Sequence, residues 1–551
     1  MSNTHPPLED HDIAESDRDT ITSGSVATLT AQAGPAANRS AAAPEPERRG
    51  LRARTVALLA VLAYVLLGAG WAVAAPFNAT YDEDEHIIRA AGAAHGELWL
   101  EPEEAIYAGG AYTWVPKSLV PPNPDCMLLE QPRPPATCLG EPPEDTSLVR
   151  TPTAAGRYHP GYYVLVGLPM VVWPNMTGVV VGRLVSALLS ALFLGAAFAV
   201  AWRYVTNRLL LGGVVLVTTP MAVNLIAAIN PNGLEISAGI ALWTGLVVLA
   251  LAKDLPERIP RHLVVLVTVS ASVLVTLRQM GPLFVLLAVI FAAIAARRGR
   301  LVALLRQRVV WLAAGVVTLA TLASVAWIFV SGLLQVSKLR QGGHVPRWYV
   351  LQDVFNYRSE EWVRQFVARF YGAILPPDWT HYLWYLLIGA VVVPVLVVSG
   401  RRLVAAVVGT VAVTAVLAVT LEFRYYDAMG ASQQGRYYLP LIAGAVLLAA
   451  AGPRLAELLG DRPLGRLTVV CAVLVAPLHL VSLAAAMTVW QHGGERFGIH
   501  ALSGEWLPAT GPVLPMVLTS VGAVLVAGLT WLRFRSLTPV PGADSRPVRG
   551  I

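Results

Sequence analysis

Long runs of apolar residues, separated by short polar links, recur along most of this chain. About 20 consecutive apolar residues are what an α-helix needs to cross the hydrocarbon core of a bilayer. The pattern therefore predicts an all-α polytopic membrane protein with about twelve transmembrane helices. The predicted spans are 55–76, 178–201, 209–229, 232–252, 262–277, 281–296, 309–330, 382–399, 403–420, 437–452, 467–490 and 513–532.

The basic residues in the links predict which helix ends face the cytoplasm. Residues 158–174 are apolar but short for a span, and prolines interrupt them. Counting them as a full crossing would place the arginines between 297 and 308 outside the cell, against the positive-inside rule. We therefore interpret 158–174 as a helix lying on the outer membrane surface, which leaves the basic links and both termini in the cytoplasm.

The polar and apolar segments divide the chain into one membrane domain and two tails. Residues 1–50 and 536–551 are predicted to be disordered cytoplasmic tails, because they lack an apolar period. The domain at 51–535 contains a large first extracytoplasmic loop with membrane-lying helices (77–177) and a second outer loop (331–381). In the second loop, apolar side chains four residues apart, beginning at Trp362, predict an amphipathic helix on the outer leaflet.

Composition and cysteine use agree with a membrane protein that has an oxidised outer loop. Hydrophobic residues make up 55% of the chain and charged residues 14%, against about 25% charged in ordinary globular proteins. The formal charge of +6 comes mainly from the links, so we expect the bilayer of the cell membrane, and no nucleic acid, as partner. Cys126 and Cys138 lie twelve residues apart in the first outer loop, and we expect a disulfide there. Cys471 lies inside an apolar run and is expected to pack in the core.

A cluster of charge opens the first outer loop, directly after the first apolar run. It holds four consecutive carboxylates, of which Asp82 and Glu83 come first, followed by His86 and Arg89. In a helix, Asp82, His86 and Arg89 share one face, bordered by Glu83. A carboxylate shielded by apolar neighbours can serve as a general base, and a nearby histidine can orient it. Asp82, Glu83 and His86 could also hold a divalent cation such as Mg²⁺ or Mn²⁺. The alternative is a solvated acidic helix start.

Several basic residues are candidates for binding an anionic substrate. Arg183 and Arg278 sit within or at the ends of apolar runs, where a cation is costly unless it is used or paired. Pairing with Glu235, or reaching to the interface, is the alternative. The outer segments add Lys338, Arg424, and Arg436 followed by Tyr437. The planar guanidinium fork suits phosphate, whereas the tyrosines also fit an interfacial aromatic belt.

Four motifs resemble those of a bacterial family of multi-pass membrane proteins of unknown function, which is itself similar to the GT-C glycosyltransferases that use polyprenyl-phosphate sugars. The motifs are Asp-Glu-x-x-His-x-x-Arg-Ala after the first helix, Tyr-x-Pro-x-Tyr-Tyr, Arg-Leu at the next helix, and a late Gly-Arg-Tyr-Tyr-x-Pro. The resemblance covers about residues 55–530. The matching residues are Asp82, Glu83, His86, Arg89, Ala90, Tyr158, Pro160, Tyr162, Tyr163, Arg183, Leu184, Gly435, Arg436, Tyr437, Tyr438 and Pro440.

The resemblance implies a GT-C-like fold and a membrane glycosyltransferase that moves a sugar from a polyprenyl-phosphate donor to a cell-envelope glycan or lipid acceptor on the outer face. It implies catalytic roles for Asp82, Glu83 and His86, with Asp82 preferred as the base and Glu83 second. We expect substrate binding by Arg89, Tyr158, Tyr162, Arg183, Arg278, Lys338, Arg424, Arg436 and Tyr437. The alternatives are a transporter or flippase of lipid-linked or anionic envelope precursors, and a non-catalytic scaffold for envelope assembly.

Overall fold

The structure, a computed structural model, describes residues 51–101, 110–129, 132–204, 208–253, 255–332, 345–494 and 500–535. The predicted tails and Lys338 lie outside the described residues, so their predictions are not tested.

The described helices confirm the polytopic helical class. Nine are long and apolar enough to cross a membrane, and a tenth span forms if α6 (Leu209–Val217) and α7 (Pro220–Ile226) are joined across a 60° bend. The nine are α1 (Ala53–Ala74), α5 (Met176–Arg203), α8 (Pro231–Leu251), α12 (Arg308–Val330), α15 (Asp378–Val398), α16 (Arg401–Met429), Gly435–Leu459, α19 (Asp461–His492) and α20 (Val513–Arg535). At 1.5 Å per residue, the 22 residues of α1 extend over about 33 Å, which matches the hydrocarbon core.

The two weakest predicted spans are present as short apolar helices. They are α9 (Arg261–Leu277) and α10 (Gly281–Ala295), of 17 and 15 residues. Counted with the ten candidate spans among the described residues, they bring the number to the predicted twelve. The Gly435–Leu459 span is itself divided into η6 (Gly435–Tyr438), α17 (Leu439–Ala450) and α18 (Pro453–Leu459).

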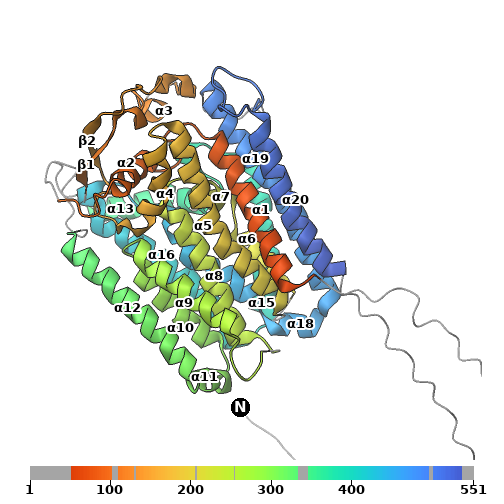
Figure 1. Cartoon of the computed structure of the whole chain (residues 1–551). Helices are drawn as coiled ribbons and strands as arrows, with labels where there is room; N and C mark the ends of the chain where they lie inside the picture. Colours follow the sequence, from red (N-terminus) through yellow and green to blue (C-terminus); the bar gives the residue numbers. More distant parts are fainter. Residues whose placement is uncertain are drawn as a thin grey trace, which may run out of the picture. The chain divides into compact units, whose positions relative to one another are not determined.

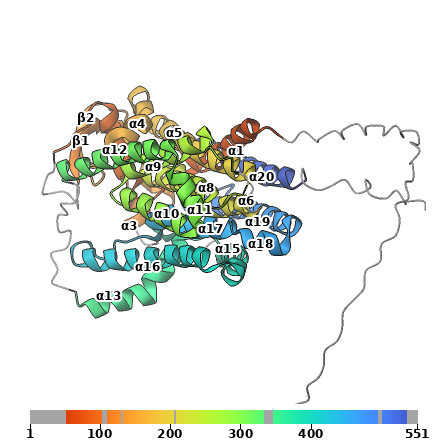
Figure 2. The same ribbon diagram turned by 90° about the horizontal axis from the view of Figure 1, so that it is seen from below.

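Helix α8 lies in the interior of the bundle (Figures 1 and 2). It packs against α5, α9, α10 and α17, while α1 packs against α5 and α20. Helix α12 packs against α9 and exposes large apolar side chains, including Trp311, Leu312 and Leu319. Such a helix is too apolar for water on its outer face, and this is the surface expected in contact with lipid.

The first loop, which includes α4 (Pro160–Val172), lies at the opposite end of the bundle from α11 (Arg298–Leu305) (Figure 1). Helix α2 (Glu83–Ala94) packs on α4 and on a hairpin of β1 (Ala111–Pro116) and β2 (Leu148–Thr153). The strands are antiparallel, with Ala111 opposite Thr153 and Pro116 opposite Leu148. This two-stranded hairpin is a small addition to the predicted helical fold, and the apolar pattern did not indicate it. Side chains along β2 alternate in burial, which is the two-residue period of a strand. Prolines in and around the strand obscured this period in the sequence.

Two shorter elements of this loop carry the predicted disulfide. Cys126 begins α3 (Cys126–Leu129), and Cys138 lies in η3 (Ala136–Leu139). The two residues form a disulfide, with Cα atoms 6.0 Å apart. Cys471 is buried and free, as expected. The bridge fixes the proline-rich part of the loop, which has little regular secondary structure of its own.

The structure contains both helices predicted to lie on the membrane surface. The 13 residues of α4 are too few for a span and are followed by Trp173, which is exposed. The second loop forms α13 (Arg347–Asp353), a π-helical turn η4 (Val354–Arg358), α14 (Ser359–Val367) and η5 (Tyr371–Ala373). Trp362 and Val367 are buried and Glu360 is exposed, so α14 is amphipathic as predicted, although Val363 is also exposed. Their position on the outer leaflet stays a prediction.

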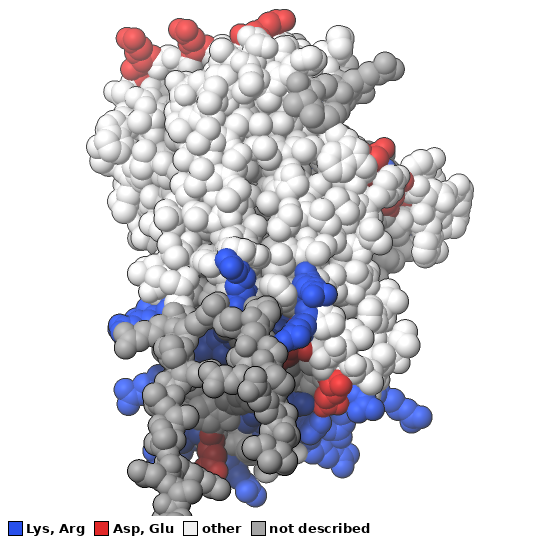
Figure 3. Space-filling view, turned by 90° about the vertical axis from the view of Figure 1, so that its right-hand side faces the viewer, with Lys and Arg blue, Asp and Glu red and all other residues white. Residues whose placement is uncertain are grey.

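Charged side chains are segregated along the bundle. On the face shown in Figure 3, a broad band nearly free of Lys, Arg, Asp and Glu separates a basic end from an end that carries acidic side chains. The basic end includes the α10–α12 link, where Arg297, Arg298, Arg306 and Arg308 are exposed. The uncharged band is what a bilayer core requires of the protein surface.

Candidate functional site

The acidic cluster begins at a tight turn between α1 and α2. Asp82 caps the N-terminus of α2 with φ of 57°, a left-handed conformation that aspartate tolerates better than most residues. Its side chain is 46% exposed, whereas Glu83 is fully buried. The turn therefore directs two neighbouring carboxylates into different surroundings.

Asp82 forms an ion pair with the arginine of the late Gly-Arg-Tyr-Tyr motif. Arg436 is 1% exposed, and its Nη2 donates to Asp82 Oδ2 at 2.6 Å. Its Nε donates to Gln434 Oε1 at 2.7 Å, and its Nη1 lies 3.5 Å from Asn232 Oδ1. Burial raises the pKa of Asp82, but the Arg436 guanidinium and the weaker influence of His86 outweigh it, so the pKa is lowered. Asp82 is thus an ionised, partly accessible carboxylate.

Two tyrosine rings and a second guanidinium surround this pair. The Arg436 guanidinium carbon lies 4.5 Å from the ring centroid of Tyr81 and 4.6 Å from that of Tyr437. Arg278 approaches the same Tyr437 ring, at 4.4 Å. It also forms an ion pair with the buried Glu235, at 3.5 Å, which is the pairing that the sequence left open. Tyr437 is therefore contacted by two cations, each balanced by one carboxylate.

A cavity of about 230 Å³ adjoins the Arg278 side of Tyr437. We call it the Arg278 cavity. The first loop, the start of α8, the α9–α10 link and α16 all contribute to its wall, together with the segment before α17. Its lining residues are Ala154, Tyr158, Glu235, Arg278, Gln279, Met280, Phe284, Leu421, Tyr425, Met429, Ser432, Gln433, Tyr437 and Tyr438. The cavity combines one guanidinium, one carboxylate and several phenol groups with apolar side chains, which is typical of a small-molecule site.

Glu83 and Arg183 form a separate, fully buried pair. Arg183 Nε and Nη2 each donate to a Glu83 oxygen at 2.7 Å, and both side chains are 0% exposed. Arg183 also donates to the carbonyls of Ala75 at 2.7 Å and Pro76 at 2.8 Å. Glu83 accepts from the backbone of Ile229 at 3.2 Å. The pair thus ties the end of α1 and the start of α2 to α5 and to the turn before α8, and neither residue lines the Arg278 cavity.

His86 packs among tyrosines of the first loop. A hydrogen bond of 2.9 Å joins its Nδ1 to the Tyr163 hydroxyl, and the two rings stack at 5.8 Å. Tyr158 meets His86 edge to face at 6.0 Å. Burial lowers the pKa of His86 to about 3, so the imidazole is neutral at physiological pH.

Neither Arg89 nor Tyr162 lines the cavity. Arg89 is buried and donates to the carbonyls of Glu97 at 2.8 Å and Leu98 at 3.0 Å, where α2 ends. The Tyr162 hydroxyl lies 2.9 Å from Ser186 Oγ, between α4 and α5. These contacts are of the kind that fix α2 and α4 in the fold.

Of the other predicted binding residues, Arg424 lies on α16 and is exposed. Its guanidinium is 5.6 Å from the ring of Tyr425, which itself lines the cavity. Of the nine predicted binding residues, the described structure thus gathers Tyr158, Arg278, Arg436 and Tyr437 near Asp82. It does not gather Arg89, Tyr162 or Arg183 there.

The remaining two carboxylates of the cluster also have distinct surroundings. Glu85 accepts from the backbone of Ala154, which anchors the hairpin to α2. Burial, followed by the nearby charge of Glu85, raises the pKa of Asp84 to about 8. Asp84 is therefore uncharged over much of the physiological range.

The predicted divalent-cation ligands do not converge. Within the described ranges, no group of three or more His, Cys, Asp or Glu side chains could hold a metal ion. Asp82 is bonded to Arg436, and both oxygens of Glu83 are bonded to Arg183. The residues named from the sequence thus do not fit such an ion.

Tyr81, Gln434 and Asn232 were not predicted as site residues, although a signal for Asn232 was present. Asn230 caps α8 by accepting from the backbone of Asn232 at 2.9 Å, ahead of Pro231 in the first turn. The Asn230 side chain also donates to the Tyr81 carbonyl at 2.8 Å. An Asn-Pro-Asn helix start is recognisable, but its contact with the first loop is tertiary.

A second, larger cavity of about 640 Å³ is lined in part by the first loop. The outer parts of its wall come from η3 and from residues 506–510, and α1 and α5 supply apolar side chains such as Val73 and Val180. Ala75 and Pro76 also line it, and their carbonyls accept from Arg183. Arg183 therefore bonds to backbone that lines this second cavity, although neither Arg183 nor Glu83 lines it.

Comparisons with known proteins give a family and distant structural likenesses. No curated protein sequence matches the chain. The structure is similar to two structures of ArnT from Cupriavidus metallidurans, one bound to undecaprenyl phosphate and one in the apo state. Each is 13% identical over 88% of this chain and 78% of ArnT, with TM-scores of 0.38 and 0.39. It is also similar to the cryo-EM structure of the arabinofuranosyltransferase AftD from Mycobacteria, with 15% identity over 80% of this chain and a TM-score of 0.39. The match covers 27% of AftD.

The model of the predicted membrane proteins designated DUF2142 matches residues 65–445. This match extends from the first spanning helix, through both loops and the Asp82–Arg436 pair, into α17. Because it covers more than half of the sequence, the chain belongs to the DUF2142 family of predicted membrane proteins.

Proposed function

We propose that this membrane protein is a glycosyltransferase that moves a sugar from a polyprenyl-phosphate donor to a cell-envelope acceptor. One observation carries the proposal: the partly exposed carboxylate of Asp82 is bonded to the buried guanidinium of Arg436, next to a cavity that holds the second guanidinium of Arg278. Transfer from a phosphate-linked sugar needs a base for the acceptor hydroxyl and cations for the leaving phosphate. The motif resemblance to GT-C enzymes supports the same reading.

In the proposed complex, the donor phosphate lies between Arg278 and Arg436. Both guanidiniums contact Tyr437, at 4.4 and 4.6 Å from its ring centroid, so both lie against the same aromatic ring. Arginine forks bind phosphate oxygens in pairs, with charge-assisted hydrogen bonds. The phenol rings of Tyr158 and Tyr437 offer flat surfaces and hydroxyl groups for the sugar.

Arrival of the phosphate would change the partner of Asp82. A carboxylate bonded to a guanidinium is a weak base, because the cation lowers its pKa. When phosphate takes the Arg436 donors, Asp82 loses that contact and its proton affinity rises. The base would then be activated by donor binding itself, which would limit wasteful proton transfer in the empty site.

The reaction follows from these positions. Asp82 accepts the proton of the acceptor hydroxyl, whose oxygen attacks C1 of the sugar from the side opposite the phosphate. The bond between C1 and the phosphate oxygen breaks, and its electron pair leaves with the polyprenyl phosphate, where Arg436 and Arg278 offset the charge. The sugar is transferred with inversion. Glu83 acts through structure in this scheme, since Arg183 holds both its oxygens.

Two observations support an outer-face site in the cell membrane. Basic side chains gather at the α11 end of the bundle (Figure 3), the distribution that faces the cytoplasm. The Cys126–Cys138 disulfide lies in the first loop together with Asp82, and disulfides persist in oxidising compartments. A lipid-linked donor also suits that face, because it reaches the site through the bilayer.

The test is turnover by the purified full-length protein in lipid nanodiscs. It is incubated with labelled polyprenyl-phosphate hexoses and pentoses and with a lipid extract of the envelope as acceptor, and released polyprenyl phosphate is measured. We expect release by the unaltered protein and none by Asp82→Asn, which should still be folded at the assay temperature, as its thermal unfolding transition would show. Glu144→Gln, in an exposed part of the same loop, is the matched control and should keep full activity.

The same assay separates the enzyme from a transporter. In sealed vesicles, a transporter would move the intact lipid-linked sugar across the bilayer without releasing polyprenyl phosphate. Full release by Asp82→Asn would remove the base assignment. Transbilayer movement without release would refute the transferase.

A further inference from the structure

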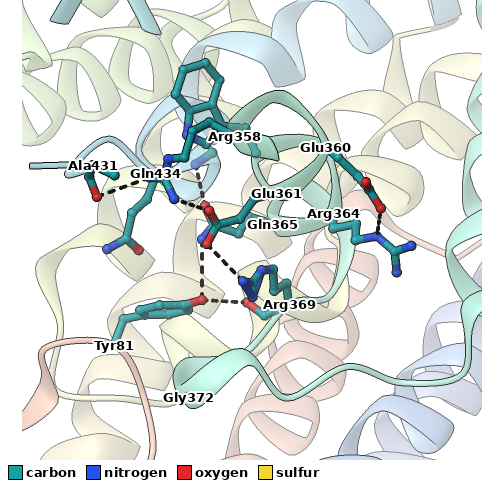
Figure 4. Close-up of polar contacts among 12 residues, drawn as sticks. Tyr81, Arg358, Glu360, Glu361, Arg364, Gln365, Arg369, Gly372, Ala431 and Gln434 are labelled. Carbon is teal, nitrogen blue, oxygen red and sulfur yellow. Dashed lines mark hydrogen bonds and ion pairs between the residues drawn. The ribbon is translucent and has the colours of Figure 1, made fainter. Parts of the chain in front are cut away.

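Helix α14 of the second loop holds the segment that leads into Arg436 (Figure 4). Trp362 Nε1 donates to the Gln433 carbonyl at 2.8 Å, and the Arg358 guanidinium donates to the same carbonyl. Gly435 lies directly against the helix, where a Cβ would come within 2.1 Å of the Trp362 carbonyl oxygen. Because backbone atoms cannot give way cheaply, a larger residue does not fit at 435. The approach of α14 therefore fixes where the chain enters η6.

Gln365 joins this segment to the first loop. It is 1% exposed on the inner face of α14. Its Oε1 accepts from the Gly435 backbone, and its Nε2 lies 3.4 Å from the Tyr81 hydroxyl, to which it donates. Tyr81 donates in turn to the Arg369 carbonyl at 3.2 Å. Figure 4 shows Tyr81 and Gln365 on the same side of α14, away from Arg364.

The hydrogen bonds of Gln365 to Gly435 and Tyr81 reach two groups that contact or adjoin Arg436. Gly435 precedes Arg436 in the chain, and the Tyr81 ring lies 4.5 Å from its guanidinium. The affinity of an arginine for phosphate depends on how well its fork is held before the ligand arrives, because ordering a long side chain on binding is costly. The buried side-chain amide of Gln365 thus constrains both the backbone that precedes Arg436 and the Tyr81 ring that packs on the Arg436 guanidinium.

We propose that Gln365 is a positioning residue for Arg436, so that the second outer loop forms part of the phosphate-binding apparatus without touching the ligand. The inference rests on the proposed function, in which Arg436 binds the phosphate of a polyprenyl donor. The surrounding ion pairs support a fixed α14. Glu361 pairs with both Arg358 and Arg369, the latter at 3.1 Å. The helix is therefore braced independently of Gln365.

The experiment measures binding of farnesyl phosphate, a short polyprenyl phosphate, to the full-length protein in nanodiscs. Four proteins are compared: the unaltered protein, Gln365→Met, Arg436→Gln and the double variant. In the two proteins that carry Arg436→Gln, Arg278 still supports weak binding. The control is Arg364→Gln, which lies on the outer face of the same helix and pairs with Glu360 and Asp378. All titrations are made well below the melting temperature of every variant.

We expect Gln365→Met to weaken binding about tenfold, the factor that corresponds to one buried hydrogen bond. In the Arg436→Gln background the same substitution should have no further effect, because the residue that it positions is gone. A general loss of structure would weaken binding in both backgrounds. If Gln365→Met does not fold, Tyr81→Phe tests the same link, since it removes the hydroxyl and keeps the ring, and should show the same dependence on Arg436.

The possible outcomes distinguish failure of the positioning role of Gln365 from failure of the proposed glycosyltransferase function. An equal loss in both backgrounds, or none in either, overturns the positioning role of Gln365 and leaves the proposed function standing. Absence of binding by the unaltered protein, with Arg436→Gln indistinguishable from it, overturns both. A loss in Arg364→Gln equal to that in Gln365→Met assigns the effect to α14 as a whole and also overturns the role of Gln365.

Discussion

Replacing Glu83 by glutamine tests whether the buried pair with Arg183 is structural or catalytic. The substitution keeps the shape of the side chain and removes its charge, which leaves the Arg183 guanidinium buried without a counter-ion. Both side chains are 0% exposed, and two hydrogen bonds of 2.7 Å join them. Removing one partner of such a pair costs about 3–5 kcal/mol, because the remaining charge cannot be solvated. We expect a loss of this size in the free energy of unfolding.

The assay is denaturant unfolding in mixed micelles, followed by tryptophan fluorescence, with Glu360→Gln as the matched control. Glu360 also pairs with an arginine, Arg364, but its side chain is 66% exposed. The control should change stability by about 0–1 kcal/mol. The double variant Glu83→Leu with Arg183→Met should be more stable than Glu83→Leu alone, because it leaves no unpaired charge in the core.

One result with Glu83→Gln would contradict a structural role for Glu83. A Glu83→Gln protein with unchanged stability and no transferase activity would show that Glu83 is not needed for the fold and acts in the reaction. That would restore Glu83 as the base and refute the reasoning from burial.

Three further predictions follow from the site and the loop. Burial raises the pKa of Asp82, and the Arg436 guanidinium is the largest of the influences that together bring it below its ordinary value; in Arg436→Gln that pKa should therefore rise. Since a base works only when ionised, the acid limb of the residual kcat/KM against pH should move to higher pH, and an unmoved limb would contradict the pairing. Arg278→Gln should raise the KM for the donor about 10- to 100-fold, the factor that corresponds to the loss of one charge-assisted hydrogen bond. The effect on kcat should be smaller. Steady-state kinetics at a fixed acceptor concentration would detect this difference. Replacing Cys126 and Cys138 together by serine should lower the free energy of unfolding by about 3 kcal/mol, in the chain-entropy model for the 12-residue separation. Denaturant unfolding under matched non-reducing conditions would measure this loss. An unchanged free energy of unfolding would mean that other contacts hold the loop.

The sequence by itself determined the local features of this protein. Spans such as α1 and α5 follow from the length of the apolar runs, because a bilayer core sets the length of helix that it can bury. The Cys126–Cys138 bridge followed from two cysteines close together in one polar loop. The amphipathic character of α14 followed from apolar residues at helical spacing. Each of these depends on residues that are near neighbours in the chain.

Only the tertiary structure decided which of the clustered charges belong to the candidate site. Asp82 and Glu83 are adjacent, yet one is bonded to Arg436, 354 residues away, and the other to Arg183, 100 residues away. The left-handed turn at Asp82 separates them, and helix packing brings each arginine into reach. In the same way, Gln365 on α14 reaches Tyr81. A charge pattern shows that partners are needed, but their identity depends on which helix ends meet, and distant packing sets that.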